Sequence, residues 1–167
     1  MIINLEIRYI DNKGEIMYKT PFIIERADPH VYKHTDGTYY MTASVPAYDL
    51  IEVRSGKSLE ELQTNDVKNV WFKHESGEQS QLIWAPEIHY VEGEFYIYYA
   101  ASHTKEEHAY DKTFQHRMYA IKCTGQNPMV DEWVECGQII TRQDSFCLDA
   151  TVCQTPETNY YIWAQKE

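Results

Sequence analysis

A pattern that returns about every sixty residues constrains the fold of this chain more than any other feature of its sequence. Each copy begins with a carboxylate, continues into a short strand-like run, turns, and continues into an aromatic run. The carboxylates are at positions 28, 87 and 149, at intervals of 59 and 62 residues. The first two turns contain Asp36-Gly37 and Glu92-Gly93, pairs that are typical of β-hairpins. The repeat therefore predicts a series of hairpins.

Further strand candidates between successive copies give about four strands per unit. They lie at 51–54 and 70–73 in the first unit, and at 117–123 and 133–140 in the second. Units of four antiparallel strands are typical of β-propeller blades. A short helical turn is expected only at 58–63. A β-sandwich would also accommodate the strands, but it leaves the matched carboxylates unexplained.

We therefore predict an all-β fold that contains about two and a half four-stranded propeller blades. The predicted boundaries are about 20–80 for blade one, about 80–142 for blade two and about 145–167 for a partial blade three. Propellers close with more blades than this, so residues 17–167 are expected to form an incomplete propeller domain. Residues 1–16 are either an N-terminal extension or a short hairpin around Asn12-Lys-Gly14.

Composition excludes several classes of partner. The formal net charge is −11, so the surface repels phosphate backbones and anionic lipids, and neither nucleic acid nor membranes are expected partners. No apolar run approaches the roughly 18 residues that span a bilayer. The first residues lack the features of a signal peptide, which predicts a cytoplasmic location. The four cysteines form no CxxC pair and are expected to be buried thiols, with no structural zinc site.

The repeated carboxylates indicate a chemical function. The innermost strands of a propeller line its axis, so an acid at the same place in each blade would converge on one pocket. Glycoside hydrolysis needs such a convergence: one carboxylate activates water and a protonated one donates to the leaving oxygen. A third negative group nearby can raise the pKa of the acid. A structural repeat motif, with each Asp acting as a turn or cap, remains the alternative.

Three motifs carry a resemblance to a known family. They are Arg26-Ala-Asp28-Pro-His-Val-Tyr, Ile83-Trp-Ala-Pro-Glu87-Ile-His and Ser145-Phe-Cys-Leu-Asp149-Ala-Thr. They resemble glycoside hydrolase family 43, most closely its α-L-arabinofuranosidases, with β-xylosidases and xylanases as nearby relatives. The resemblance runs from about Pro21 to Glu167. It implies a five-bladed propeller and an inverting, exo-acting hydrolase of pentose-containing oligosaccharides derived from hemicellulose.

The resemblance also implies roles for individual residues. Asp28 matches the general base that activates water, and Asp149 matches the aspartate that tunes and orients the general acid. The general acid of the family is a Glu on a later blade, and no residue of this chain matches it. Trp84 could form a wall of the sugar site or belong to the core. The residues expected to contact substrate are Glu87, Trp84, His30, His89 and Phe146.

No cofactor is required by this mechanism, although the resemblance allows a calcium ion on the propeller axis. Three histidines between positions 103 and 116 lack the spacing of a zinc enzyme, so no metal ligands are predicted. Two hypotheses of function remain: a hydrolase of which this chain is an incomplete part, or a truncated, catalytically inactive product. The second would be a sugar-binding remnant or a half-propeller that must assemble, and a homo-oligomer could cover its open sheet edges.

Overall fold

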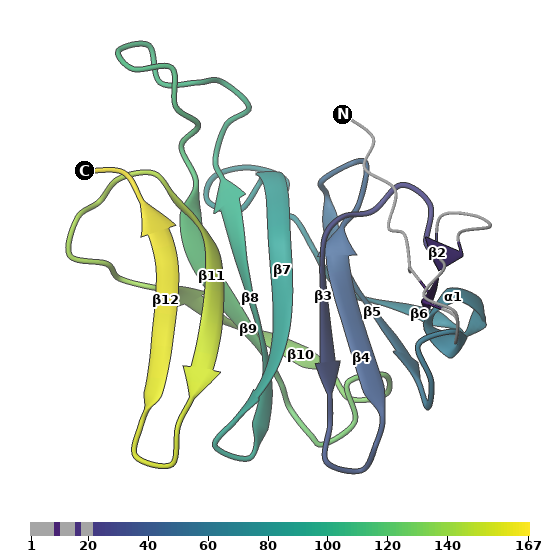
Figure 1. Ribbon diagram of the computed structural model, residues 1–167. Helices are drawn as coiled ribbons and strands as arrows, with labels where there is room; N and C mark the ends of the chain where they lie inside the picture. Colours follow the sequence, from purple (N-terminus) through teal and green to yellow (C-terminus); the bar gives the residue numbers. More distant parts are fainter. Residues whose placement is uncertain (1–8, 11–15, 18–21) are drawn as a thin grey trace.

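The computed structural model of the protein describes residues 9–10, 16–17 and 22–167, and Figure 1 shows their arrangement in three antiparallel sheets and a short strand pair. The first sheet has the order β3-β4-β5-β6, and the second has the order β7-β8-β9-β10. Their strands are β3 (Ala27–Lys33), β4 (Tyr39–Ser44), β5 (Leu50–Gly56), β6 (Val67–Phe72), β7 (Gln81–Val91), β8 (Glu94–Ser102), β9 (Arg117–Cys123) and β10 (Trp133–Gln138). The third sheet pairs β11 (Cys147–Gln154) with β12 (Asn159–Gln165). The all-β prediction with four-stranded units is confirmed.

Each sheet begins with the hairpin that the sequence predicts. The turn between β7 and β8 consists of Glu92 and Gly93, with φ of 52° and 87°. Two residues with positive φ form the tight turn whose twist matches that of antiparallel strands. In the turn between β3 and β4, Gly37 has φ of 83° and the Asp36 carboxylate accepts a bond from Thr38 N–H at 2.8 Å. Because these turns are formed by neighbouring residues, the repeated hairpins can be recognised from the sequence.

The main core lies between the first two sheets. It is built from the aromatic and β-branched residues of alternate strand positions, among them the fully buried Ile51, Phe95 and Tyr99. A second cluster, which includes Met118, Cys147 and Ala150, packs the second sheet against the third. The sheets therefore stack face to face through apolar side chains, as adjacent propeller blades do.

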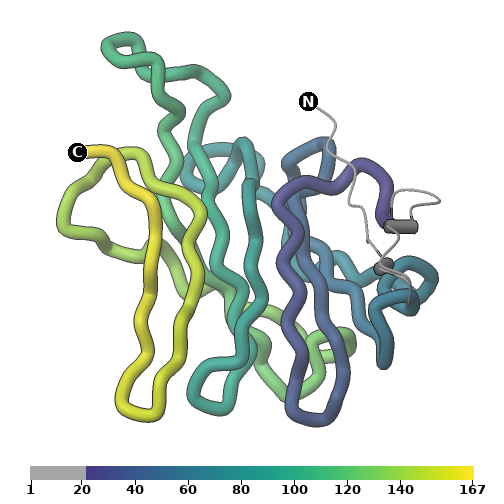
Figure 2. Tube along the Cα trace, in the orientation of Figure 1, coloured from purple at the N-terminus to yellow at the C-terminus, as the bar shows by residue number. Residues whose placement is uncertain are grey.

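The first strands of the three sheets lie side by side, in the order β3, β7, β11 (Figure 2). Each is hydrogen-bonded to only one neighbour in its own sheet. The three strands run in the same direction, so their beginnings gather at one end of the molecule, where the loop 103–116 rises above the strands (Figure 1). This arrangement brings together residues that are about sixty positions apart in the chain.

Some local expectations need correction. The single helix of the described residues, α1 (Glu61–Thr64), begins later than the predicted turn at 58–63, and its first N–H lies 3.4 Å from the Ser58 hydroxyl. Cys123 and Cys147 are buried free thiols, but Cys136 and Cys153 are exposed, so the expectation of four buried thiols was wrong for two of them. Cys136 is exposed because it lies on β10, the outermost strand of its sheet.

The N-terminal segment contributes one described feature. β1 (Tyr9–Ile10) pairs antiparallel with β2 (Ile16–Met17). The rest of the predicted extension 1–16, including its turn, lies outside the described residues.

Candidate active site

A bulge interrupts the first strand of each sheet at the same place. The pairing shifts between Ala27 and His30 in β3, between Trp84 and Glu87 in β7, and between Leu148 and Thr151 in β11. Each bulge contains a residue with left-handed φ: Asp28 at 49°, Ala85 at 43° and Asp149 at 54°. Non-glycine residues in this region are uncommon, and bulges are often found next to active sites, where they redirect side chains.

This register corrects the alignment of the three repeats. Asp28 and Asp149 occupy the same structural position, as the sequence analysis expects, but the residue of β7 at that position is Ala85. Glu87 corresponds instead to His30 and Thr151, two residues further along their strands. Aligning Pro29 with Pro86 gives the correct register, so the sequence contained the signal. Matching carboxylates alone hid it, because no acid occupies the bulge of β7.

Asp28 is linked to the second sheet through one hydroxyl group. Ser44 of β4 donates to Asp28 Oδ2 at 3.3 Å, and the buried N–H of Ala85 donates to the same Ser44 hydroxyl at 2.8 Å. Nearby, the Thr42 hydroxyl donates to the carbonyl of Pro86 at 2.7 Å. Ser44 therefore holds the Asp28 side chain against the bulge of β7. Sequence reasoning did not identify Ser44, because its role depends on a contact between two blades.

Two residues before Asp28, an ion-pair network anchors the start of β3. Glu52 of β5 is buried and accepts from Arg26 with both oxygens, at 2.9 Å each. Arg54 donates to the same carboxylate at 3.0 Å. Burial alone would raise the pKa of Glu52, but the hydrogen bonds and positive charges of Arg26 and Arg54 hold it below its ordinary value. The bidentate contact fixes the backbone that leads into the bulge.

The residues at the next equivalent positions form a cluster beside the bulges. His89 Nε2 lies 2.9 Å and His30 Nε2 lies 3.7 Å from the same oxygen of Glu87, Oε2. The two imidazole rings have centroids 4.6 Å apart. Burial would raise the pKa of Glu87, but hydrogen bonds with His89 and Thr151 and the nearby imidazoles hold it below its usual value. Burial lowers the pKa of His30 to about 4, so its imidazole is neutral at pH 7.

The pKa of Asp149 is shifted upward, in contrast to that of Glu87. Burial raises the pKa of its carboxyl group, and the negative charges of Asp28 and Glu87 raise it further. Three carboxylates from three strands thus meet at one end of the molecule. In the part of the chain that the structure describes, no Lys or Arg forms an ion pair with any of them. Asp149 can therefore hold a proton more readily than a solvated carboxylate, and the unpaired negative charge of the group favours a cation.

The two aromatic candidates lie at the same end. Trp84 is stacked on the buried His116, with ring centroids 4.0 Å apart, and packs edge-on against Phe114 at 5.1 Å. Burial lowers the pKa of His116 to about 4, and its Nε2 lies 2.9 Å from the Leu82 carbonyl. One face of Trp84 is therefore occupied by protein, which favours the packing role. Phe146 lies 6.0 Å from His116, at the edge of the same aromatic group.

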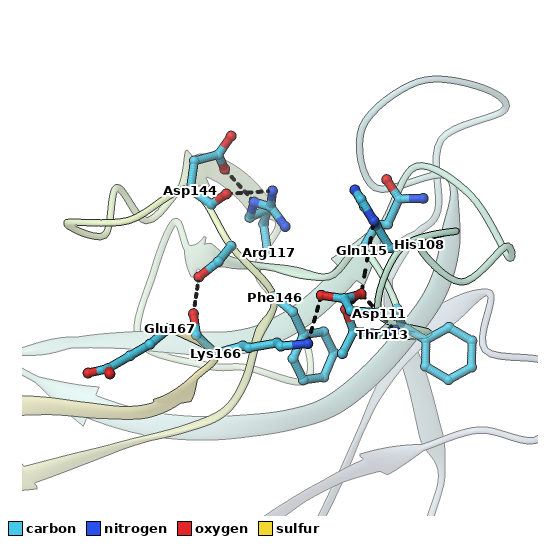
Figure 3. A pocket seen from close by; sticks show the side chains of 11 residues that line it. His108, Asp111, Thr113, Gln115, Arg117, Asp144, Phe146, Lys166 and Glu167 are labelled. Carbon is cyan, nitrogen blue, oxygen red and sulfur yellow. Dashed lines mark hydrogen bonds and ion pairs between the residues drawn. The ribbon is translucent and has the colours of Figure 1, made fainter.

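Phe146 also lines a pocket of about 260 Å³ between loop 103–116 and the segment before β11 (Figure 3). Four of the charged groups in its wall form two ion pairs. Arg117 contacts Asp144 at 2.5 Å, and Lys166 contacts Asp111 at 2.7 Å. Asp28, Glu87 and Asp149 do not line this pocket. Apart from Phe146, its walls were not predicted from the sequence, because loop residues carry no repeat signal.

Comparison with known proteins decides the family. The profile of glycosyl hydrolases family 43 matches residues 18–167. The chain belongs to glycosyl hydrolase family 43. Among solved structures of the family, an α-L-arabinofuranosidase from Lactobacillus brevis is 55% identical with a TM-score of 0.84, covering 89% of this chain and 46% of that one. The structural neighbours in this family are five-bladed propellers, which confirms the predicted fold class for the part of a propeller that this chain spans.

Curated family 43 relatives are also arabinofuranosidases. An extracellular exo-α-(1→5)-L-arabinofuranosidase from Streptomyces avermitilis is 42% identical, and α-L-arabinofuranosidase 43 from Humicola insolens is 38% identical. The match covers 90% and 91% of this chain, and 30% of each relative. The chain therefore spans about a third of the length of these relatives.

These relatives overturn the expected cytoplasmic location. The enzymes from Streptomyces avermitilis and Streptomyces chartreusis are both named extracellular. The expectation depended on the absence of a signal peptide at the first residues. That expectation was wrong because this chain spans only part of the length of its relatives. Its first residues therefore carry no information about a leader sequence. With respect to membranes, no helix among the described residues has the length and apolarity to cross one.

Proposed function

We propose that this chain provides the water-activating part of the active site of an inverting α-L-arabinofuranosidase. The observation that supports this most is the pair of equivalent bulges in β3 and β11, the strands on either side of β7, which places Asp28 and Asp149 close enough to interact electrostatically. Left-handed φ at both aspartates is energetically unfavourable for an ordinary strand residue, so a functional position explains it better than a turn or cap.

In the proposed mechanism, Asp28 acts as the general base. The Ser44 hydroxyl holds its Oδ2, which leaves the other carboxylate oxygen to accept a proton from water as that water attacks the anomeric carbon. Asp149 carries a raised pKa and would contribute negative potential at the point where the general acid must keep its proton. The general acid itself is assigned to no residue of this sequence.

The substrate class is proposed from the relatives. Arabinofuranosidases are the curated proteins that the chain matches, so we propose a terminal α-L-arabinofuranosyl group of an oligosaccharide as the group that binds. Glu87, His30 and His89 lie beside the two aspartates and would line the site, and Phe146 would border the side where the leaving sugar lies. Preference for arabinose over xylose forms part of the proposal.

The test uses a substrate that does not need the general acid. Nitrophenolate departs without protonation, so base-side catalysis alone should hydrolyse 4-nitrophenyl α-L-arabinofuranoside, whereas an arabino-oligosaccharide should react far more slowly. Asp28→Asn should lower turnover of the aryl substrate by about 100-fold or more, the size of a general-base contribution. Asp36→Asn, an exposed aspartate in the turn that ends the same hairpin, is the matched control and should retain activity.

Two results would contradict the proposal. Turnover that survives Asp28→Asn would assign the base to another residue or the activity to a contaminant. A folded chain that neither hydrolyses the aryl arabinofuranoside nor binds arabino-oligosaccharides would support the alternative of an inactive product.

A further inference from the structure

We propose that His30, Glu87 and His89 form a binding site for a divalent transition metal ion of the zinc class. The ligand atoms are one imidazole nitrogen of each histidine and one carboxylate oxygen, and all three lie within 4.8 Å of one another. They come from two different sheets, because His30 lies on β3 and the other two lie on β7. No ligand spacing in the sequence predicts this set.

Two of the three ligand separations are close to those of a tetrahedral metal centre. Ligands about 2.0–2.1 Å from a zinc ion at tetrahedral angles lie about 3.3 Å from one another. In the structure, Glu87 Oε2 is 2.9 Å from His89 Nε2 and 3.7 Å from His30 Nε2, values on either side of that separation. Small rotations of the side chains would equalise them. Two imidazoles and a carboxylate, with one position left for water, are a ligand set that zinc adopts in proteins.

The position of His30 indicates that the cluster is more than the hydrogen-bonded pair of Glu87 and His89. A Glu87–His89 hydrogen bond is complete without a third group. His30 nevertheless stands against it with its Nε2 beyond hydrogen-bonding distance and its Nδ1 buried without a partner among the described residues. Leaving a buried polar atom unpaired is unfavourable, so such a group needs an explanation. A metal ion would bind Nε2 and not the unpaired Nδ1, and it would offset part of the cost of burying the ring.

The surroundings also favour a cation. The carboxylate of Asp149 lies close enough to those of Asp28 and Glu87 to interact electrostatically with both. The Thr151 side chain bonds Glu87 and would orient it as a metal ligand, as outer-shell groups do in metal sites. The ligand types discriminate between metals. Calcium needs six to eight oxygen ligands, whereas imidazole nitrogens favour zinc, cobalt or nickel. The ligand set therefore fits a zinc-class ion better than calcium.

A bound ion would connect the first two sheets at the end where the bulges lie. Since binding to the folded state alone raises stability by mass action, the midpoint of thermal unfolding should rise with zinc concentration.

The experiment titrates the chelator-stripped 167-residue chain with Zn²⁺, and in parallel with Ca²⁺, by isothermal titration calorimetry. One zinc ion per chain is expected, together with a concentration-dependent rise in the thermal midpoint and no comparable effect of calcium. His30→Gln and His89→Gln should each weaken zinc binding roughly tenfold or more, since even outer-shell changes cost 10–100-fold. The matched control is His108→Gln, on the exposed loop and outside the cluster.

Three results would overturn the site: no zinc binding by a folded chain, calcium binding at least as tight as zinc, or equal zinc affinity in the His30→Gln variant and the parent chain. Circular dichroism of each variant separates loss of a ligand from loss of folding. Visible absorption of bound Co²⁺ is a second readout, and its bands should change in His30→Gln and stay unchanged in His108→Gln. None of these readouts uses glycosidase activity, so the metal site and the proposed function can fail independently.

Discussion

Replacing the Glu52 carboxylate tests whether the ion-pair network under the start of β3 determines the stability of the domain. Glu52→Gln keeps the size of the side chain and removes its charge. The carboxylate is 6% exposed, and the two arginine side chains that it binds are 17% and 12% exposed. Removing one partner of a buried pair leaves uncompensated charge and costs 3–5 kcal/mol in measured cases. Because both guanidinium groups retain some access to water, we expect the free energy of unfolding to fall by about 3 kcal/mol, at the lower end of that range.

Urea denaturation followed by tryptophan fluorescence measures this loss. The matched control is Glu94→Gln, which removes a comparable contact with Lys122 at 2.9 Å from a side chain that is 45% exposed. Exposed pairs contribute about 1 kcal/mol or less, so the control should be nearly neutral. Equal losses in the two variants, or a loss below about 1 kcal/mol in Glu52→Gln, would refute the argument that burial of the network decides its energy.

Glu52→Gln should also change how the stability of the domain depends on pH in acid. The pKa of Glu52 is lower in the folded state than in the unfolded state, so the folded state holds the proton less tightly. Its stabilising contribution is therefore complete above the unfolded pKa of about 4.3 and is lost as the pH falls through the folded value. Glu52→Gln should show a smaller loss of stability between pH 5 and pH 3 than the parent chain, roughly the range in which a carboxylate with a depressed pKa takes up its proton.

Three further predictions concern other parts of the domain. Ser44→Ala should lower the free energy of unfolding by about 1–3 kcal/mol, because the buried N–H of Ala85 loses its acceptor. Ser55→Ala on β5 removes a hydroxyl that has no hydrogen-bond partner among the described residues, and it should change the free energy of unfolding by less than about 0.5 kcal/mol. Phe95→Ala should cost about 3–5 kcal/mol in urea denaturation, because the ring is fully buried between the first two sheets, and a smaller loss would mean that the core collapses around the cavity. The pKa of His74 is raised by its hydrogen bond to a carboxylate on β10, so its contribution should be present below the unfolded pKa of about 6.5 and disappear as the pH rises through the folded value. His74→Gln should therefore remove part of the stability difference between pH 6 and pH 8, and an unchanged difference would contradict the assignment.

The sequence by itself determined the class of fold and the family, and it pointed to Asp28 and Asp149 as candidate site residues. Hairpin turns such as Glu92-Gly93 and alternating apolar residues are local signals, since turn conformation and strand periodicity depend on neighbours a few residues away. They were sufficient to predict four-stranded units and most strand positions. The motifs around Asp28 and Asp149 were also sufficient to predict the family, because residues of a motif are read in order along the chain.

The tertiary structure decided which residues of different repeats correspond and meet. A β-bulge adds a residue to one strand without a reliable local signal, so the pairing of β7 with β8 was needed to choose between two alignments of the repeats. It favours the match of Pro29 with Pro86, which makes Ala85 equivalent to Asp28, over the match of carboxylates. The link from Ser44 to Asp28 and the cluster of His30 with Glu87 likewise join different sheets. Such contacts depend on how sheets pack against each other, and packing is set by the whole core and not by any segment of about ten residues.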